Sequence, residues 1–254
     1  MPRKARKKSL TGVYHIVFRG INRQTIFEDE TDKHRFLETL AKYKVISGIE
    51  LYAYCLMDNH VHLLVKETDE SVSVFMKKLS SSYVYWYNLK YERCGHLFQG
   101  RFNSENVEDN LYFMTVLRYI HQNPLKAGVV RSVWDSKWTS AHEYIRKAVI
   151  VDIDRGLSLF SSERKAALRQ YVVYMEEEND EECLDYNETV KLSDDKVREY
   201  LQTLGVKSSS NLQQMSRKER DGVLAQVKKH QGTSIRQLSR ITGISKSVID
   251  RIKG

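Results

Sequence analysis

The chain has 254 residues, 41% of them hydrophobic and 29% charged, which is the composition of a globular protein with one medium domain and a smaller one. It has no apolar run of the roughly 18 residues that a membrane span needs and no apolar stretch behind its basic N-terminus, so we expect a cytoplasmic protein without a signal peptide. Its three cysteines form no CxxC pair, which argues against a disulfide framework and a thiolate zinc site.

Charge is unevenly distributed along the chain. The formal net charge of +8 favours a polyanionic partner, because lysine and arginine attract phosphate groups. Residues 176–199 hold 11 acidic and 3 basic residues, whereas residues 207–254 hold 11 basic and 3 acidic residues. We therefore expect three parts, namely a domain over residues 1–150, a helical extension with a solvated acidic linker over 151–192, and a basic helical domain over 193–254.

The spacing of apolar residues predicts an alternation of strands and helices in the first half of the chain. The turn pair Asp58-Asn59 between two β-rich runs indicates an antiparallel hairpin. Pro124 should end the last helix, because proline disfavours helical geometry in the residue before it. The resulting order, β-α-β-β-α-β-α, predicts an α+β fold with a ferredoxin-like antiparallel sheet and one added helix. The expected strands are 13–18, 50–57, 60–66 and 102–107, and the expected helices are 33–47, 71–91 and 109–122.

Two pairs of residues carry the candidate chemistry. His60 and His62 alternate along a predicted strand, so both project from one face, about 6.6 Å apart along the chain, and can share a metal ion. Tyr119 and Asn123 lie four residues apart on one helix face, which can pack across the histidines. The alternatives stay open, since an isolated histidine pair often only packs on a sheet and a lone helical tyrosine usually belongs to the core. Tyr112 suits that structural role.

Four segments, in this order, resemble the HUH single-tyrosine transposases, and specifically the branch of REP-associated tyrosine transposases. The similarity extends over about residues 10–175. The tyrosine followed by the sequence YIHQNP is the most specific part of the pattern. The segments are YHIVFRGINRQTIF (14–27), MDNHVHLLV (57–65), GHLFQGRFNSENVED (95–109) and LRYIHQNPLKAGVV (117–130).

The resemblance implies the HUH endonuclease fold for residues 1–150 and a transposase that cuts and rejoins single-stranded DNA. Tyr119 would attack the phosphodiester and form a 5′-phosphotyrosine intermediate. His60, His62 and Asn123 would hold a divalent ion, Mg²⁺ or Mn²⁺ by similarity, although imidazole ligands alone fit zinc equally well. The proton acceptor for Tyr119 is not identified, because His121 faces elsewhere on the helix.

In REP-associated transposases the substrate is a hairpin-forming repeat with a single-stranded flank, which also implies a bacterial, nucleoid-associated protein. Arg19, Asn22, Arg23 and Arg101 lie in the matching segments and carry donors for phosphates or base edges. Each of them is as readily explained as a solvated surface residue. The sequence leaves open whether the protein acts as a monomer or a homodimer.

The C-terminal segment SIRQLSRITGISKSVIDRIKG has the pattern of a helix-turn-helix motif and resembles the helical DNA-binding domain of bacterial replication initiators. Gly243 would supply the turn, with Leu238 and Ile241 directed inward and Ser245 capping the second helix. Val248, Ile249 and Ile252 would form the apolar face of that helix. The outward residues Lys246, Ser247 and Arg251 would contact duplex DNA. A small helical interaction bundle is the alternative.

Two other functions compete with the transposase. A non-catalytic DNA-binding protein or transcriptional repressor would have the same charge and C-terminal motif, but it has no chemical reason to keep two histidines, a tyrosine and an asparagine together. A rolling-circle replication initiator would share the chemistry, but its motif surroundings do not resemble YIHQNP.

Overall fold

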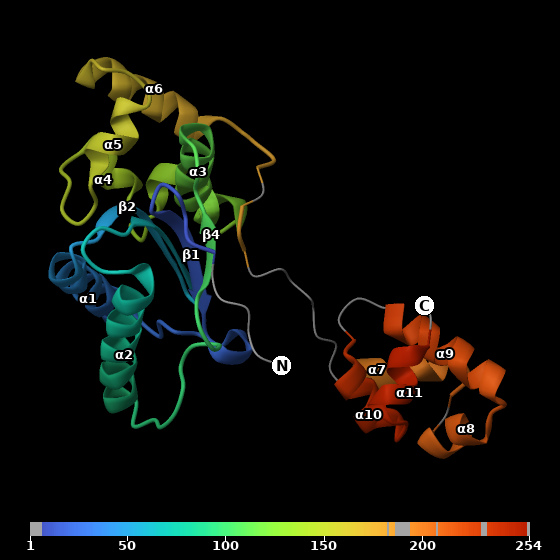
Figure 1. Ribbon diagram of the computed structural model, residues 1–254. Helices are drawn as coiled ribbons and strands as arrows, with labels where there is room; N and C mark the ends of the chain where they lie inside the picture. The colour runs from blue at the N-terminus through green and yellow to red at the C-terminus, as the bar shows by residue number, and fades with distance from the viewer. Residues whose placement is uncertain (1–6, 182, 186–193, 207, 230–232, 253–254) are drawn as a thin grey trace. The chain divides into compact units, whose positions relative to one another are not determined.

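The computed structural model of the protein describes residues 7–181, 183–185, 194–206, 208–229 and 233–252 (Figure 1). The chain divides into two units, residues 1–186 and residues 187–254, each with its own hydrophobic core. None of the helices in the described ranges has the length and hydropathy needed to cross a membrane.

The first unit is built on a four-stranded antiparallel sheet in the order β2-β3-β1-β4. Its strands are β1 (Val13–Arg19), β2 (Glu50–Met57), β3 (His60–Lys66) and β4 (Asn103–Asn106). This order confirms the predicted ferredoxin-like sheet, and β2 and β3 form the predicted hairpin around Asp58-Asn59. β4 is two residues shorter than expected, because Phe102 and Val107 lie outside its pairing with β1.

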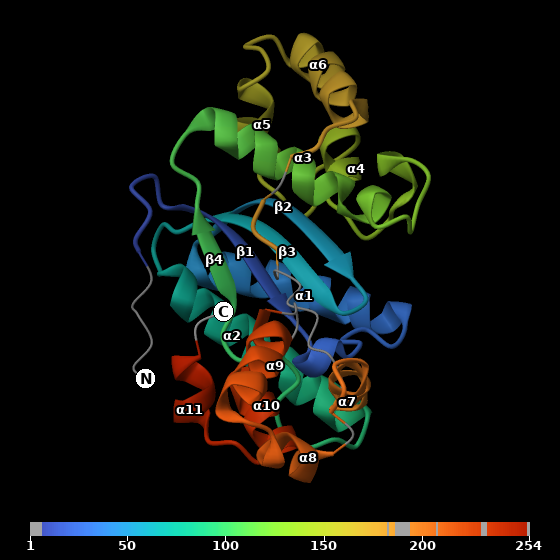
Figure 2. The same ribbon diagram turned by 90° about the vertical axis from the view of Figure 1, so that its right-hand side faces the viewer.

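Helices cover both faces of this sheet. α1 (Glu30–Ser47) and α2 (Val72–Lys90) pack together on one face, and α3 (Asn110–Lys126) packs against β2 and β3 on the other (Figures 1 and 2). The Asp109 carboxylate caps α3 by accepting a hydrogen bond from the Tyr112 backbone N–H at 2.7 Å. Because both faces are covered, the central residues of β1, β2 and β3 are buried on every side.

The prediction that α3 ends before Pro124 is wrong, because the helix continues to Lys126 with Pro124 inside its last turn. A proline in a helix removes one N–H donor but has a backbone angle that suits the helix. The turn is completed beyond it by backbone bonds from Ala127 to Asn123 (3.0 Å) and from Val129 to Pro124 (2.9 Å). Asn123 therefore lies within a regular helix rather than at a frayed end.

The chain beyond α3 folds back onto this side of the unit. It begins with the single-turn 3₁₀ helix η2 (Val133–Asp135). A similar short helix, η1 (Ile21–Arg23), follows β1 earlier in the chain. Three α-helices follow η2 and pack on the same core, with α6 against α3 (Figure 1). They are α4 (Ala141–Ile145), α5 (Ile153–Ser158) and α6 (Arg164–Glu176).

The first part of the acidic segment is not the solvated connector that its composition predicts. Glu177 and Glu181 form ion pairs with Arg118 of α3, whose guanidinium also lies 3.8 Å from the centre of the Tyr174 ring. Lys126 adds a hydrogen bond to the Asn179 side chain at 2.8 Å. These contacts fasten the segment along α3, because the buried guanidinium exchanges water for carboxylate partners.

In its described residues, the second unit has five helices around a small aliphatic core. Gly243 joins α10 to α11 with a positive φ of 72°, a conformation that glycine adopts without strain, and Leu238 and Ile241 are buried as predicted. Ser245 precedes α11 but makes no capping side-chain bond, and Val248 is 37% exposed rather than packed inside. The helices are α7 (Asp194–Thr203), α8 (Ser209–Gln214), α9 (Arg217–Lys229), α10 (Ile235–Thr242) and α11 (Lys246–Arg251).

Candidate metal and tyrosine site

His60 and His62 project from the face of β3 that α3 covers, with ring centres 5.0 Å apart. His60 Nδ1 lies 2.6 Å from the Asn59 side-chain oxygen. An oxygen accepts this bond, so Nδ1 carries the proton and Nε2 has a free lone pair. His60 Nε2 is buried and forms no hydrogen bond with any of the described residues. A buried nitrogen with an unused lone pair is what a metal ligand requires.

His15 is a third histidine of the site, which the sequence did not single out. It lies on β1 diagonally across from His62, and its Nε2 is 3.1 Å from His62 Nδ1. The two rings stack with centres 5.3 Å apart, and both side chains are fully buried. When His62 Nδ1 donates to His15, the Nε2 atom of His62 is the acceptor of the ring, and it faces the Asn123 side-chain nitrogen at 3.4 Å.

Tyr119 and Asn123 of α3 lie over the histidines, as the helix spacing predicts. The Tyr119 ring makes edge contacts with His15 and His62, with centres 5.9 and 5.7 Å apart. The Asn123 side-chain nitrogen is 3.4 Å from His62 Nε2, so the amide oxygen would face the histidine only after the amide turns by 180°. Tyr112 bonds instead to Glu105 at 2.5 Å.

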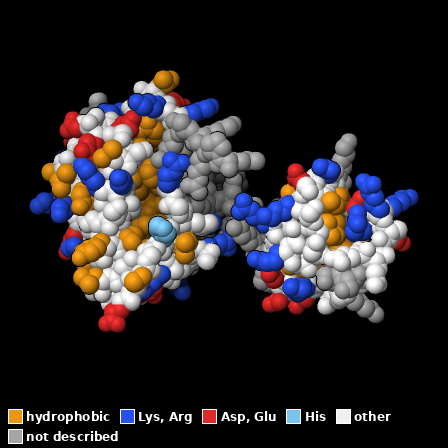
Figure 3. Space-filling view, turned by 60° about the horizontal axis from the view of Figure 1, so that its bottom comes forward, with side chains coloured by type: hydrophobic (Ala, Val, Ile, Leu, Met, Phe, Trp, Pro, Cys, Tyr) orange, Lys and Arg blue, Asp and Glu red, His pale blue; other side chains and the backbone are white. Residues whose placement is uncertain are grey.

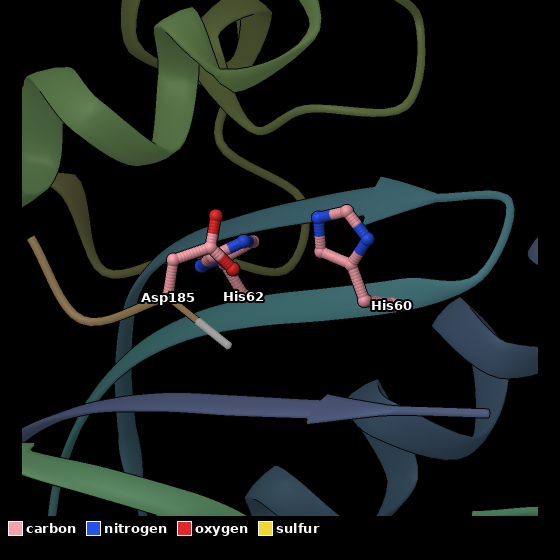
Figure 4. A group of neighbouring side chains, drawn as sticks. All are labelled: His60, His62 and Asp185. Atoms are coloured by element: carbon pink, nitrogen blue, oxygen red, sulfur yellow. The ribbon is translucent and has the colours of Figure 1, made fainter. Parts of the chain in front are cut away.

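Asp185, on the acidic segment, completes the cluster. The Tyr119 hydroxyl donates to its Oδ2 at 3.2 Å, and one oxygen of Asp185 and one nitrogen each of His60 and His62 all lie within 4.8 Å of one another (Figure 4). Sequence analysis missed this residue because it lies 66 positions after Tyr119 in a stretch without periodicity. The excess of acidic residues there was the only available signal.

Burial shifts the proton affinities of these groups in opposite directions. Desolvation lowers the pKa of His15 to about 3 and also lowers the pKa values of His60 and His62. The imidazoles are therefore neutral near pH 7, as metal ligands must be. Desolvation raises the pKa of the Tyr119 phenol, and the nearby Asp185 carboxylate raises it further. The phenol therefore keeps its proton until a base accepts it.

His121 is not that base. Its two ring nitrogens are used by the Tyr171 hydroxyl at 2.9 Å and the Ser140 hydroxyl at 2.8 Å. Desolvation lowers the pKa of this fully buried imidazole to about 3. His121 thus belongs to the polar core between α3, α4 and α6, as its position on the helix predicts.

The residues predicted to bind DNA lie in three places. Arg19 is the register partner of His60 on β1, and its Nε donates to Gln99 at 3.2 Å. Asn22 and Arg23 are exposed in η1, both with positive φ. Arg101 is exposed in the loop before β4. Only Arg19 borders the histidines directly.

In the second unit, Lys246, Ser247 and Arg251 are all exposed on α11. Arg251 lines a hollow of about 620 Å³ together with Arg217 and Arg220 of α9. The basic side chains of two helices thus gather at one place on this unit.

The comparisons with known proteins concern the first unit. A solved REP-associated tyrosine transposase, bound to a REP hairpin, is 17% identical with a TM-score of 0.50, covering 61% of this chain and 96% of that one. A putative transposase from Deinococcus radiodurans is 20% identical with a TM-score of 0.34, covering 44% of this chain and 91% of that one. No curated protein matches the sequence. Residues 9–123, which include all four predicted site residues, match the family model "Transposase IS200 like". The first unit is thus similar to the IS200-like transposases over residues 9–123, a little less than half of the chain.

Proposed function

We propose that the protein is a metal-dependent endonuclease and strand transferase for single-stranded DNA, with Tyr119 as its nucleophile. The observation that carries the proposal is the Tyr119 ring packed against His62, with its hydroxyl bonded to Asp185 beside two histidines. A phenol, a proton acceptor and two neutral imidazoles together form a nucleophile and an ion site. A repressor that only retained this fold would not need them.

The donor set fits a divalent cation. His60 and His62 each offer an Nε2 lone pair, Asp185 offers a carboxylate oxygen, and Asn123 offers its amide oxygen once the amide turns. Mg²⁺ and Mn²⁺ both accept oxygen ligands, and Mn²⁺ binds imidazole more readily. A bound cation would polarise the scissile phosphate and neutralise the charge that develops on it.

The groups of this chain then act in a defined order. The Tyr119 oxygen attacks the phosphorus while its proton passes to Asp185 Oδ2, which already accepts that hydrogen bond at 3.2 Å. A bond forms between the tyrosine oxygen and phosphorus, and the bond from phosphorus to the 3′ oxygen breaks. The 5′ phosphate stays on Tyr119, and the 3′ oxygen leaves and takes up a proton from solvent water, which gives a 3′ hydroxyl that can reverse the reaction.

The proposed substrate is a DNA hairpin with a single-stranded flank. The support is the fold shared with a REP-associated tyrosine transposase that was solved with a REP hairpin. Arg19 lies beside His60, and Asn22 and Arg23 follow it in the exposed turn η1. These donors are suited to phosphates on either side of the cleaved bond.

We further propose that the second unit binds duplex DNA through α11. Lys246, Ser247 and Arg251 are exposed on this helix. Two arginines of α9 lie near Arg251, and both form ion pairs with Asp221. A short basic helix after a tight glycine turn is the arrangement that enters a major groove.

Replacing Tyr119 with phenylalanine tests the nucleophile. Tyr119→Phe keeps the ring in its pocket but removes the attacking oxygen, and loss of a nucleophile costs on the order of 10⁶ in rate. We expect no covalent protein–DNA band on denaturing gels when labelled hairpin DNA from the repeats beside its gene is incubated with Mg²⁺ or Mn²⁺. Tyr112→Phe is the control and should retain the band. Normal adduct formation by Tyr119→Phe would refute the proposal, and binding without any adduct in the wild type would favour the repressor.

Replacing Asp185 with asparagine tests the proton acceptor. Asp185→Asn keeps the shape but removes the basic oxygen, and loss of a general base lowers the rate by about 10²–10⁴-fold. Single-turnover cleavage should slow by this factor while hairpin binding is retained. Asp180→Asn, on the same acidic segment, should cleave normally. An unchanged rate for Asp185→Asn would exclude the residue from proton transfer.

Replacing His15 with phenylalanine tests the orientation of His62. In His15→Phe the Nδ1 proton of His62 loses its acceptor, so the tautomer that carries the proton on Nε2 is no longer disfavoured. Losing such a partner lowers metal affinity about 10–100-fold. Calorimetric titration with Mn²⁺ should show this loss, and His142→Phe on α4 should show none. Unchanged affinity in a protein with the wild-type melting temperature would contradict the assignment.

Removing the basic side chains of α11 tests the second unit. The double variant Lys246→Ala and Arg251→Ala should bind duplex DNA more weakly. The slope of log affinity against log salt should fall by about one for each phosphate that the variant no longer neutralises. Arg198→Ala on α7 is the control with the same kind of charge removed. If the double variant binds duplex DNA with the wild-type salt slope, α11 does not contact the phosphates.

A further inference from the structure

A groove without a role in the reaction lies on the α2 side of the sheet. It consists of two hollows of about 380 and 370 Å³ that share Ser80, Phe98 and Gly100. α2 forms one wall, and the loop between α2 and β4 forms the other. Figure 3, which brings the lower end of this unit in Figure 1 forward, shows hydrophobic side chains gathered there with lysine and arginine side chains beside them.

Each hollow offers aromatic surface. Phe102, which is partly exposed, lines the first together with the largely buried Phe18 and Phe98, and Tyr85 and His96 line the second. Tyr85 is 75% exposed, so its ring is open to a ligand. Flat aromatic walls of this kind stack on nucleobases of any sequence.

The charge of the groove complements a nucleic acid backbone. Among the described residues that line the two hollows, Lys77 and Arg101 are cationic and none carries a carboxylate. Their exposed side chains lie at the apolar hollow, so phosphates could pair with them while the bases enter the groove. A protein segment as occupant would find few polar partners here.

The groove is joined to the candidate site by one loop. The Gln99 backbone N–H donates to the Arg19 carbonyl at 2.8 Å, and the Arg19 side chain donates back to Gln99 at 3.2 Å. Arg19 is the register partner of His60, whereas its neighbour Phe18 faces the groove. The candidate site and the groove therefore meet at the end of β1, where Arg19 borders one and Phe18 borders the other. A single-stranded DNA segment that leaves the histidines reaches the groove at this edge.

We infer that this groove binds two successive nucleobases of the single-stranded flank of the substrate. The inference rests on the proposed function and deepens it, because it assigns a second contact to DNA that has left the cleavage site. The bases stack on the aromatic walls, and Lys77 and Arg101 hold the connecting phosphates. The hollows are of the size usual for small-molecule sites, roughly 300–1,000 Å³.

Scanning abasic substitutions tests the groove. The probe is a fluorescein-labelled DNA hairpin with a single-stranded tail, taken from the repeats beside its gene, in which one tail base at a time is removed. Anisotropy with the full chain in the presence of a chelator measures binding without cleavage. We expect abasic sites at one or two adjacent tail positions to weaken binding about 5- to 150-fold, the range for loss of one stacked base.

The protein variants make the test specific. In Tyr85→Ala and Phe102→Ala the same abasic positions should cost nothing further, because the stacking partner is already gone. Leu89→Ala removes an equally exposed apolar side chain of α2 outside the groove and should behave like the wild type. A penalty that persists in both variants would overturn the inference, as would loss of a homodimer in Tyr85→Ala, which would make the groove a protein interface.

The outcomes separate this inference from the proposed function. If the wild type forms the covalent adduct but the abasic profile is flat, the groove does not hold bases and the enzyme stands. A localised profile without any adduct supports the groove in a protein that only binds DNA. If the full chain binds no hairpin at all, both are overturned.

Discussion

The pairing register of β1 with β3 is the constraint on which the candidate site depends. It places Val17 opposite His62 and Arg19 opposite His60, so that His15 lies diagonally beside His62. Side chains alternate between the faces of a strand, so a shift by one residue would turn both histidines of β3 towards α1 and α2. They would then be buried away from Tyr119. The sheet core and the candidate ion site are thus fixed by the same hydrogen-bond ladder.

The same burial has two chemical consequences in this site. Desolvation keeps the imidazoles of His60 and His62 neutral, which favours a cation, and it also stabilises the protonated phenol of Tyr119, which opposes attack. In the proposed reaction the Asp185 carboxylate offsets this cost, because it accepts the phenol proton at the moment of attack. The ion pairs of Arg118 with Glu177 and Glu181 hold the segment that carries Asp185. The acidic residues of that segment therefore have a structural role, because they hold Asp185 beside Tyr119.

Features that depend on contacts within one helix or strand could be predicted from the sequence, whereas those that depend on contacts between distant segments could not. The strands and helices of the first unit come from apolar periodicity, and the facing of His60 with His62 and of Tyr119 with Asn123 comes from spacing within one element. His15 and Asp185 escape this reasoning, because the register of β1 and the path of the chain after α6 bring them to the site. The prediction for Pro124 is wrong for a different reason, since local backbone bonds four and five residues long complete the helix beyond the proline. Local rules fix elements, whereas tertiary contacts decide which partners complete a site.

Two DNA-binding surfaces on one chain would keep the cleaved strand near the site, as reversible strand transfer requires. Once the 5′ phosphate is on Tyr119, the freed 3′ end is held only by non-covalent contacts, and its escape would prevent rejoining. A groove that stacks two bases beside the site and a basic unit that holds duplex DNA would each raise the local concentration of the strand. Stacking depends little on salt, whereas the contacts of Lys246 and Arg251 with phosphates weaken steeply with it. At high salt the groove would therefore carry most of the retention.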